Sequence, residues 1–335
     1  LLKSSPEAGE ARGILRRRGV SGEMVERFSL GYAPKAAGLG AALKRRGFDA
    51  ESLLQAGLLV QREDRVREMF WSRLLFPIRS GKGEVIGFGG RVLGEGEPKY
   101  LNSRESEYFS KGRVLYGLFE ALPALRKDRR AVVLEGYMDV IALHQFGFSN
   151  AVAPLGTALT EDHAALLRRW ADSVTILFDP DAAGAAAAVK GAELLLTKGF
   201  SVAVATVPDG LDPDELLHQR GPEALQALLD GAVDLAEFKT RVLLGRFKGR
   251  PGPEEMAKVV AQVLETIGKC PNEVLRSDWV KRLHSITGVD EASLIAQLNR
   301  LQHPEEPPAL RRRPEKPALR GRLPSDDTEV LLALL

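Results

Sequence analysis

The sequence predicts an α/β protein, α+β overall, in which a mixed α/β unit precedes a central α/β domain with a largely parallel sheet and a C-terminal helical unit. Three observations support this. Apolar stretches alternate with glycine-rich turns over residues 73–93, short apolar runs alternate with helical segments over 131–208, and helical periodicity dominates 214–300. With 335 residues, 44% of them hydrophobic, the chain can bury a core divided among two or three units.

The first elements are predicted helices. Over residues 10–31, Leu15, Met24 and Phe28 stand among charged residues at near-helical spacing, and Ser21 is suited to cap a second helix. Residues 73–93 read "RLLFPIRSGKGEVIGFGGRVL", which predicts a hairpin around the "SGKGE" turn. Its "GFGG" lacks the full dinucleotide-binding spacing, so we interpret these glycines as a tight strand crossing or a sheet bend.

Strands and helices alternate in the middle of the chain. The runs "AVVLEG", "AVAPLGT", "VTILFD" and "SVAVATVP" are predicted strands with helical segments between them, which indicates a parallel sheet covered on both faces. We expect a basic N-terminal α/β unit at 1–128, the central domain at 129–215 and a helical unit at 216–300. A proline-rich linker at 301–324 and the truncated start of a further domain at 325–335 would follow.

The charge is unevenly distributed, although the net charge is only +2. Residues 1–130 hold 25 basic and 16 acidic residues, a net of +9, whereas residues 131–221 hold 5 basic and 12 acidic residues, a net of −7. This pattern fits a phosphate-binding surface beside a metal site, although solvated helix faces would produce it too. A single cysteine, Cys270, excludes internal disulfides and multi-cysteine zinc sites, and the five histidines lack ligand spacing.

No apolar run in the sequence is long enough to span a bilayer, and the first residues contain neither an initiator Met nor a signal peptide. We therefore expect an internal fragment of a cytoplasmic protein.

Carboxylates follow three predicted strands of the central domain: Glu135 after the first, Asp179 and Asp181 after the second, and Asp209, Asp212 and Asp214 after the third. Since ligands gather beyond the carboxyl ends of parallel strands, we expect these side chains to share one crevice. Like charges that close need cations, and oxygen ligands without His or Cys favour Mg²⁺ or Mn²⁺. Two such ions suit in-line phosphoryl transfer, so Glu135 is expected to meet a metal ion or its bound water.

Each cluster also has a simpler interpretation. A single strand-end Glu before Gly is more often a turn or a cap, and "DPD" is a common turn and helix-capping sequence. The metal-site hypothesis therefore depends on all three clusters ending strands of one domain.

These residues resemble the polymerase core of bacterial DNA primases, the DnaG family, with its TOPRIM domain. The TOPRIM likeness is carried by "EGYMD" (135–139), "DPDAAG" (179–184) and "DPD" (212–214). Outside that domain it is carried, in the same order, by "RRGVSGEMVERFSLGYAP" (17–34), "FPIRSGKGEVIGFGGRVL" (76–93), "PKYLNSRESEYFSKGRVLYGL" (98–118) and "AVAPLGTALTEDH" (151–163). The resemblance covers roughly residues 10–300.

The resemblance implies a role for each matching position. Glu135, Asp179 and Asp181 would be catalytic, as the principal ligands of two or more Mg²⁺ or Mn²⁺ ions, with Asp212, Asp214 and Asp139 as further or water-mediated ligands. Template or nucleotide phosphates would be contacted by Arg79, Arg91, Lys99, Tyr100, Asn102, Ser103, Lys111 and Arg113. Cations hold phosphate without reading sequence, and Tyr100 or Tyr108 could stack on a base. Without the resemblance, each of these Lys and Arg residues could equally be an ordinary solvated surface residue.

The chain departs from the family pattern at a few positions. Pro180 replaces the Gly of the common Asp-Gly-Asp, and Ala182 replaces the basic residue that follows it. Arg104, Ser106 and Ser110 also differ from the usual residues. These departures affect the details of contacts and leave the reaction class unchanged.

The implied function is that of a nucleotidyltransferase, the DNA-directed RNA polymerase core of a replicative primase. It would join NTPs into a short RNA primer on single-stranded DNA, which yields an RNA–DNA hybrid. The resemblance also implies a replicative helicase as a partner, bound through a C-terminal domain that is mostly absent here. Zinc is expected only in an N-terminal domain outside this chain. The protein would be a monomer of the bacterial cytoplasm, at the replisome and without membrane contact.

Two alternatives remain at this point. One is another TOPRIM enzyme, either a nuclease or a topoisomerase, the latter of which needs a nucleophilic tyrosine. The other is a non-catalytic nucleic-acid-binding module that keeps the fold.

Overall fold

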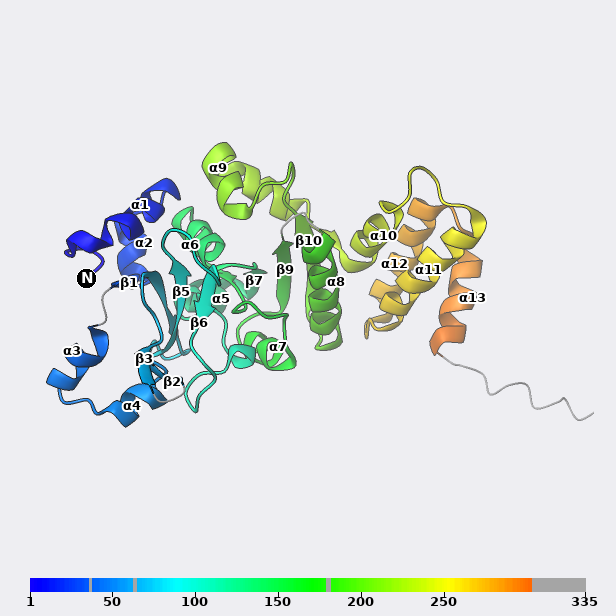
Figure 1. Ribbon diagram of the computed structural model, residues 1–335. Coiled ribbons are helices and arrows are strands. Elements are labelled where there is room, and N and C mark those ends of the chain that lie inside the picture. Colours follow the sequence, from blue (N-terminus) through cyan, green and yellow to red (C-terminus); the bar gives the residue numbers. More distant parts are fainter. Residues whose placement is uncertain (36–37, 63–64, 179–181, 303–335) are drawn as a thin grey trace, which may run out of the picture.

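The computed structural model describes residues 1–35, 38–62, 65–178 and 182–302. The N-terminal elements lie at one end of an elongated molecule, the central sheet lies in the middle, and a helical bundle forms the other end (Figure 1). Within the described part of the chain, no helix is both long enough and apolar enough to cross a membrane.

The N-terminal unit combines short helices with a four-stranded antiparallel sheet in the order β1-β4-β5-β6. Its strands are β1 (Gly31–Ala33), β2 (Leu59–Arg62), β3 (Arg65–Glu68), β4 (Arg73–Arg79), β5 (Val85–Val92) and β6 (Tyr100–Asn102). Its helices are η1 (Pro6–Ala8), α1 (Gly9–Arg17), α2 (Gly22–Arg27), α3 (Leu39–Arg45), α4 (Ala50–Gln55) and η2 (Lys111–Arg113). Strands β2 and β3 form a separate hairpin.

Two local predictions for this unit are confirmed. The Ser21 side chain accepts a hydrogen bond from the backbone N–H of Met24 and so caps α2. Strands β4 and β5 form the predicted hairpin, with Phe76 opposite Gly89 and a register shift between Ile78 and Arg79.

The glycines of "GFGG" serve close packing instead of the expected crossing or bend. They lie within β5, which pairs continuously with β4 from Gly87 to Val92. A Cβ added to Gly89 would lie 2.4 Å from Tyr137 Cζ, and one added to Gly90 would lie 2.8 Å from Phe70 Cδ1. Aromatic rings therefore pack directly on the backbone of this strand.

The central unit contains a five-stranded sheet in the order β11-β10-β9-β7-β8. Its strands are β7 (Arg130–Val133), β8 (Ala151–Val152), β9 (Ser173–Phe178), β10 (Ser201–Thr206) and β11 (Val233–Asp234). Only β11 pairs antiparallel, so the predicted largely parallel sheet and the α/β class are confirmed. The accompanying helices are α5 (Leu118–Asp128), α6 (Tyr137–Gln145), α7 (Glu161–Arg168), α8 (Ala182–Thr197) and α9 (Pro213–Asp230).

The central sheet is buried on both faces. Along β9, Val174, Ile176 and Phe178 belong to one hydrophobic core, whereas Leu177 belongs to the other. This alternation is the signature of a parallel sheet covered by helices on each side.

The helical bundle consists of α10 (Leu235–Leu244), α11 (Pro253–Gly268), α12 (Glu273–Thr287) and α13 (Glu291–Gln302). Glu193 of α8 joins the bundle to the central unit, because its carboxylate bonds Lys239 Nζ at 2.9 Å and Lys269 Nζ at 2.6 Å. Helix α9 crosses the predicted boundary at 215 and packs on α6, so the bundle itself begins with α10. Most of the predicted linker at 301–324 and all of 325–335 lie outside the described residues.

Candidate active site

The carboxyl ends of β7, β9 and β10 lie side by side, because β9 pairs in parallel with both of the other strands. Glu135 follows β7, and Asp212 and Asp214 follow β10 at the start of α9. Asp179 and Asp181 follow β9, but they lie outside the described residues. The sheet order therefore meets the condition on which the predicted crevice depends, namely that the three strands are neighbours.

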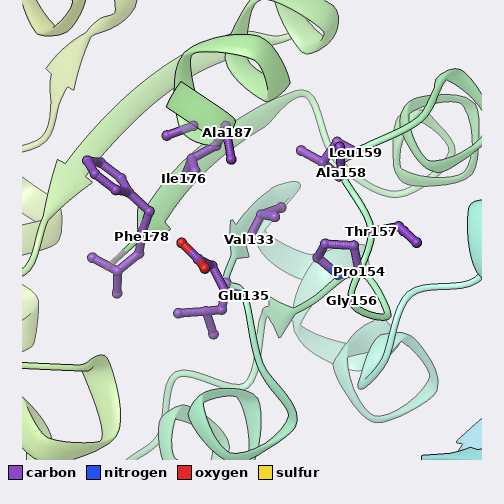
Figure 2. A pocket seen from close by; sticks show the side chains of 13 residues that line it. Val133, Glu135, Pro154, Gly156, Thr157, Ala158, Leu159, Ile176, Phe178 and Ala187 are labelled. Carbon is purple, nitrogen blue, oxygen red and sulfur yellow. The ribbon is translucent and has the colours of Figure 1, made fainter. Parts of the chain in front are cut away.

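Glu135 lines a cavity of about 260 Å³ at this edge of the sheet. Val133, Ile176 and Phe178 form apolar walls from the strand ends, and the loop after β8 with the first turns of α8 closes the other side. Glu135 projects its carboxylate into this hollow (Figure 2). It is the only charged side chain among the described lining residues.

Asp139 lies in the first turn of α6, four residues after Glu135. Gly136 is the N-cap residue of this helix, and a Cβ added to it would lie 2.7 Å from Asp139 Oδ2. The glycine thus makes room for the carboxylate. A negative charge in the first turn of a helix is stabilised by the helix dipole.

Asp212 and Asp214 form ion pairs with a residue of the N-terminal unit. Arg18 Nη1 lies 3.1 Å from Asp212 Oδ2 and 2.7 Å from Asp214 Oδ2. Asp212 also caps α9 by accepting a hydrogen bond of 2.7 Å from the backbone N–H of Glu215. Asp214 is only 2% exposed, and its Oδ1 lies 3.1 Å from His218 Nδ1. These two predicted metal ligands are therefore also structural residues.

The charges of this ion pair are perturbed by burial. Burial raises the pKa of the Asp214 carboxyl above its usual range, and the hydrogen bond and charge of Arg18 oppose that rise. Burial disfavours the charge on Arg18, but the hydrogen bonds to both carboxylates more than compensate and raise the pKa of its guanidinium. Arg18 therefore favours the ionised form of Asp214, against the effect of burial.

Arg18 was not among the predicted site residues. The signal that could have identified it is the Arg17–Arg18 pair that opens the motif at 17–34. Arg18 lines a cleft of about 360 Å³ together with Arg17, Arg91 and Asp214. Arg91 comes from β5 and holds its guanidinium over the Tyr100 ring, 5.8 Å from the ring centroid. Three guanidinium groups thus border one hollow, an arrangement suited to phosphate.

Tyr137 and Asn102 connect the two units. The Tyr137 hydroxyl donates a hydrogen bond of 2.6 Å to Asn102 Oδ1, and Asn102 Nδ2 donates one of 2.8 Å to the carbonyl of Leu155. The Tyr137 ring also stacks on Tyr100, with centroids 5.9 Å apart. Burial raises the pKa of Tyr100 and of Tyr137, so both hydroxyls stay protonated. The network ties the antiparallel sheet to the loop that borders the Glu135 cavity.

Two of the predicted phosphate contacts are engaged inside the protein. Ser103 is 2% exposed, and its hydroxyl accepts a hydrogen bond of 3.0 Å from the backbone N–H of Phe88. Arg79 donates a hydrogen bond of 2.6 Å to the Ser29 hydroxyl and lies 3.4 Å from the Glu120 carboxylate. These contacts give both residues supporting roles in the N-terminal unit.

Three further predicted contacts lie at or near the surface. Lys99 is exposed and follows directly on the turn that leads into β6. Lys111 begins η2, and its carbonyl lies 2.8 Å from His163 Nε2 at the N-terminus of α7. Arg113 pairs with Asp162 at 3.1 Å, but both side chains are largely exposed. Such surface pairs contribute little to stability, so Arg113 can exchange its partner for a phosphate.

The predicted metal site stays a prediction, because two of its principal ligands lie outside the described residues. Among the described residues, no group of three or more His, Cys, Asp or Glu side chains is placed to hold an ion. Asp179 and Asp181, which would complete the set, are not among them. Two features of the site suit a divalent cation such as Mg²⁺. The Glu135 side chain lines the hollow, and the predicted donors at this edge of the sheet are all oxygens.

The chain matches two family models. One is described as "DNA primase catalytic core, N-terminal domain" and matches residues 1–122; the other is described as "Toprim-like" and matches residues 132–217. A DNA primase of Halalkalibacterium halodurans is 41% identical over 288 residues, which are 84% of this chain and 48% of that protein. The chain spans about half the length of the curated relatives it matches.

Solved structures agree with this result. A DnaG primase catalytic domain bound to single-stranded DNA is 41% identical, with a TM-score of 0.75 and coverage of 87% of this chain and 92% of that one. A DNA primase domain from Pseudomonas aeruginosa is 39% identical, with a TM-score of 0.78 and coverage of 90% and 95%. This chain belongs to the DnaG primase family. The predicted family and fold class are thereby confirmed, and the Glu135 cavity belongs to the TOPRIM unit of a primase core.

Proposed function

We propose that this chain is the RNA polymerase core of a replicative primase, which joins NTPs into short RNA primers on single-stranded DNA. The observation that carries this proposal is the convergence of the β7, β9 and β10 carboxyl ends beside a cleft bordered by Arg17, Arg18 and Arg91. Carboxylates at one edge and guanidinium groups next to it are the two halves of a site for metal-dependent phosphoryl transfer.

Glu135, Asp179 and Asp181 would hold the divalent ions, Mg²⁺ or Mn²⁺ and two or more in number, while Asp139 would serve as a water-mediated ligand. When bound, such ions lower the pKa of the primer 3′-hydroxyl and offset the charge that develops on the pyrophosphate. Asp212 and Asp214 become ligands only if Arg18 gives up its bonds to them.

The remaining predicted residues divide into two groups in this proposal. Arg91, Lys99, Lys111 and Arg113, joined by Arg18, would contact template or nucleotide phosphates, because each lies at or near the surface. Tyr100, Asn102, Ser103 and Arg79 would hold that surface in place through the internal bonds already described.

The wider assignments are also proposals. The related DnaG catalytic domain bound to single-stranded DNA supports a DNA template for this chain. The family alone implies the other assignments. These are NTPs as substrates, an RNA–DNA hybrid as product, a helicase partner bound through a C-terminal domain, and a bacterial cytoplasmic setting. We propose a monomer, with zinc confined to a separate N-terminal domain.

The experiment is primer synthesis on single-stranded DNA with ribonucleotides and either Mg²⁺ or Mn²⁺. We expect metal-dependent product from the unmodified chain and a loss of roughly 100-fold or more in Glu135→Gln and Asp179→Asn. Glu254→Gln is the matched control, because Glu254 is an exposed carboxylate of α11 in the helical bundle. Full activity of Glu135→Gln would contradict the proposal. A covalent protein–DNA adduct would favour the topoisomerase alternative.

A further inference from the structure

Helix α10 of the helical bundle packs against the wall of the Glu135 cavity. Phe178 ends β9 and lines that cavity together with Glu135 (Figure 2). Phe238 of α10 packs on the Phe178 ring, edge to face, with ring centroids 5.2 Å apart and ring planes at 69°. Both rings are buried in the same hydrophobic core. Phe178 therefore connects the bundle to the cavity.

The position of Phe238 is fixed by contacts on either side of it in the chain. Asp234 caps α10 and belongs to β11, which pairs with β10 at the edge of the central sheet. Lys239, the residue after Phe238, pairs with Glu193 of α8 at 2.9 Å and donates a hydrogen bond of 2.6 Å to the Thr266 hydroxyl. The Lys239 and Glu193 side chains are only 15% and 18% exposed, and breaking a pair that is so far buried is costly. The ring of Phe238 thus presents a fixed surface to the sheet.

The same helix contacts the element on the other side of the acidic loop. Phe178 ends β9 and Ala182 begins α8, so the residues that carry Asp179 and Asp181 in the sequence join two elements. Helix α10 packs on both of them, on β9 through Phe178 and on α8 directly (Figure 1). The first turns of α8 also line the Glu135 cavity. The bundle therefore supports two walls of the cavity at once.

We propose that Phe238 is a positioning residue for the metal site, because through Phe178 it holds the wall of the Glu135 cavity in the arrangement that binds a divalent ion. Functional groups must be held within about 0.5 Å of their productive geometry, so residues behind a metal site influence its affinity. The inference rests on the proposed function in one respect, the binding of divalent ions at Glu135. Core packing alone explains the burial of both rings but predicts no change in metal affinity, which separates the two interpretations.

Binding of Mn²⁺ alone, followed by electron paramagnetic resonance of the free ion, tests this role without any need for activity. Phe238→Leu keeps an apolar side chain but removes the edge-to-face contact, and it should weaken Mn²⁺ binding on the order of 10- to 100-fold. Leu283→Ala is the matched control, since Leu283 of α12 is 1% exposed in the same core but is not among the described lining residues of the cavity. It should lower the unfolding midpoint and leave the Mn²⁺ affinity unchanged.

A double-mutant cycle tests whether the effect passes through the pair of rings. Phe178→Leu approaches the same contact from the sheet and should weaken Mn²⁺ binding by a similar factor. The double variant should bind no more weakly than either single variant, because each substitution already removes the one contact. Circular dichroism and urea unfolding establish that each variant is folded at the assay temperature, and Phe178→Leu carries the test if Phe238→Leu does not fold.

The magnesium dependence of primer synthesis gives a second readout. In Phe238→Leu, the Mg²⁺ concentration for half-maximal rate should rise on the order of 10-fold or more, while the affinity for single-stranded DNA stays unchanged. In Leu283→Ala both values should equal those of the unmodified chain. A role in folding alone would lower the amount of active protein without moving the half-saturating Mg²⁺ concentration.

Equal Mn²⁺ affinity in Phe238→Leu, Phe178→Leu and the unmodified chain would overturn the positioning role, and primer synthesis by the unmodified chain would show that the proposed function stands without it. An equal loss of affinity in Leu283→Ala would also overturn it, in favour of general destabilisation. Unchanged Mn²⁺ binding in Glu135→Gln would overturn the metal site on which both proposals rest. Weakened Mn²⁺ binding in Phe238→Leu, in a chain that makes no primer, would support the positioning role and contradict the polymerase.

Discussion

Replacing Gly89 with Ala should destabilise the junction between the two sheets. The added Cβ would lie 2.4 Å from Tyr137 Cζ and 2.5 Å from its hydroxyl oxygen, well inside van der Waals contact. Tyr137 has little room to move, because it is 7% exposed and its ring stacks on Phe76 with centroids 5.0 Å apart. Its hydroxyl is also fixed by the 2.6 Å hydrogen bond to Asn102.

The magnitude follows from these contacts. Overpacking of a buried site costs about 1–3 kcal/mol, and the displaced hydroxyl would lose a hydrogen bond that contributes about 1 kcal/mol. We therefore expect the free energy of unfolding to fall by about 2–4 kcal/mol. Because Tyr137 lies two residues after Glu135 at the start of α6, primer synthesis should fall as well.

The assay is urea unfolding followed by circular dichroism and fluorescence. Gly81→Ala is the matched control, since a Cβ at this turn position would meet no atom within 4 Å, and it should change the free energy of unfolding by less than about 0.5 kcal/mol. In a Tyr137→Leu background, which removes the clashing ring atoms, Gly89→Ala should cost much less. Equal unfolding midpoints for Gly89→Ala and Gly81→Ala would refute this reasoning.

Three other substitutions test the contacts around the site. Arg18→Met leaves the buried carboxylate of Asp214 without its cation, so it should lower the free energy of unfolding by about 2–4 kcal/mol. Thermal unfolding measures this effect, and an unchanged Tm would show that the ion pair does not stabilise the protein. Asn102→Ala removes the partner of Tyr137 and should cost about 1–3 kcal/mol and reduce DNA binding, both measurable on one preparation. Burial raises the pKa of Glu193, but hydrogen bonds from lysine and threonine outweigh burial and lower this pKa from 4.5 to about 2. Glu193 therefore contributes about 3 kcal/mol to the free energy of unfolding. This contribution is fully present above pH 4.5 and is lost as the pH falls toward 2. Glu193→Gln should therefore flatten the pH dependence of Tm between pH 4.5 and 2, and an equally steep profile would contradict this assignment.

The sheet and its acidic edge could be predicted because the information is local. Each strand of the central sheet is a short apolar run, and Glu135 follows its run within two residues, so the position of the carboxylate follows from the strand prediction alone. The sheet topology makes β7, β9 and β10 neighbours. The alternation of strands and helices along the sequence strongly constrains this topology.

The partners of individual side chains could not be predicted in the same way. Arg18 and Asp214 are 196 residues apart in the sequence, and only the packing of α1 near α9 brings them together. Ser103 and Lys99 stand four residues apart in one motif, yet Ser103 is buried and Lys99 is exposed. A charge or a hydroxyl in a motif indicates its chemistry, but tertiary packing determines whether it faces a ligand or the protein interior.

Extension of an annealed RNA primer by a single ribonucleotide on a DNA template tests the central claim most directly, because it does not require the chain to initiate a primer. With Mg²⁺ or Mn²⁺ present, the unmodified chain should lengthen the RNA by one templated nucleotide, and EDTA or Glu135→Gln should abolish the product. If the chain binds the hybrid tightly but adds no nucleotide over a 100-fold range of enzyme concentration, roughly the loss expected of a disabled metal site, it is a binding module and not a polymerase.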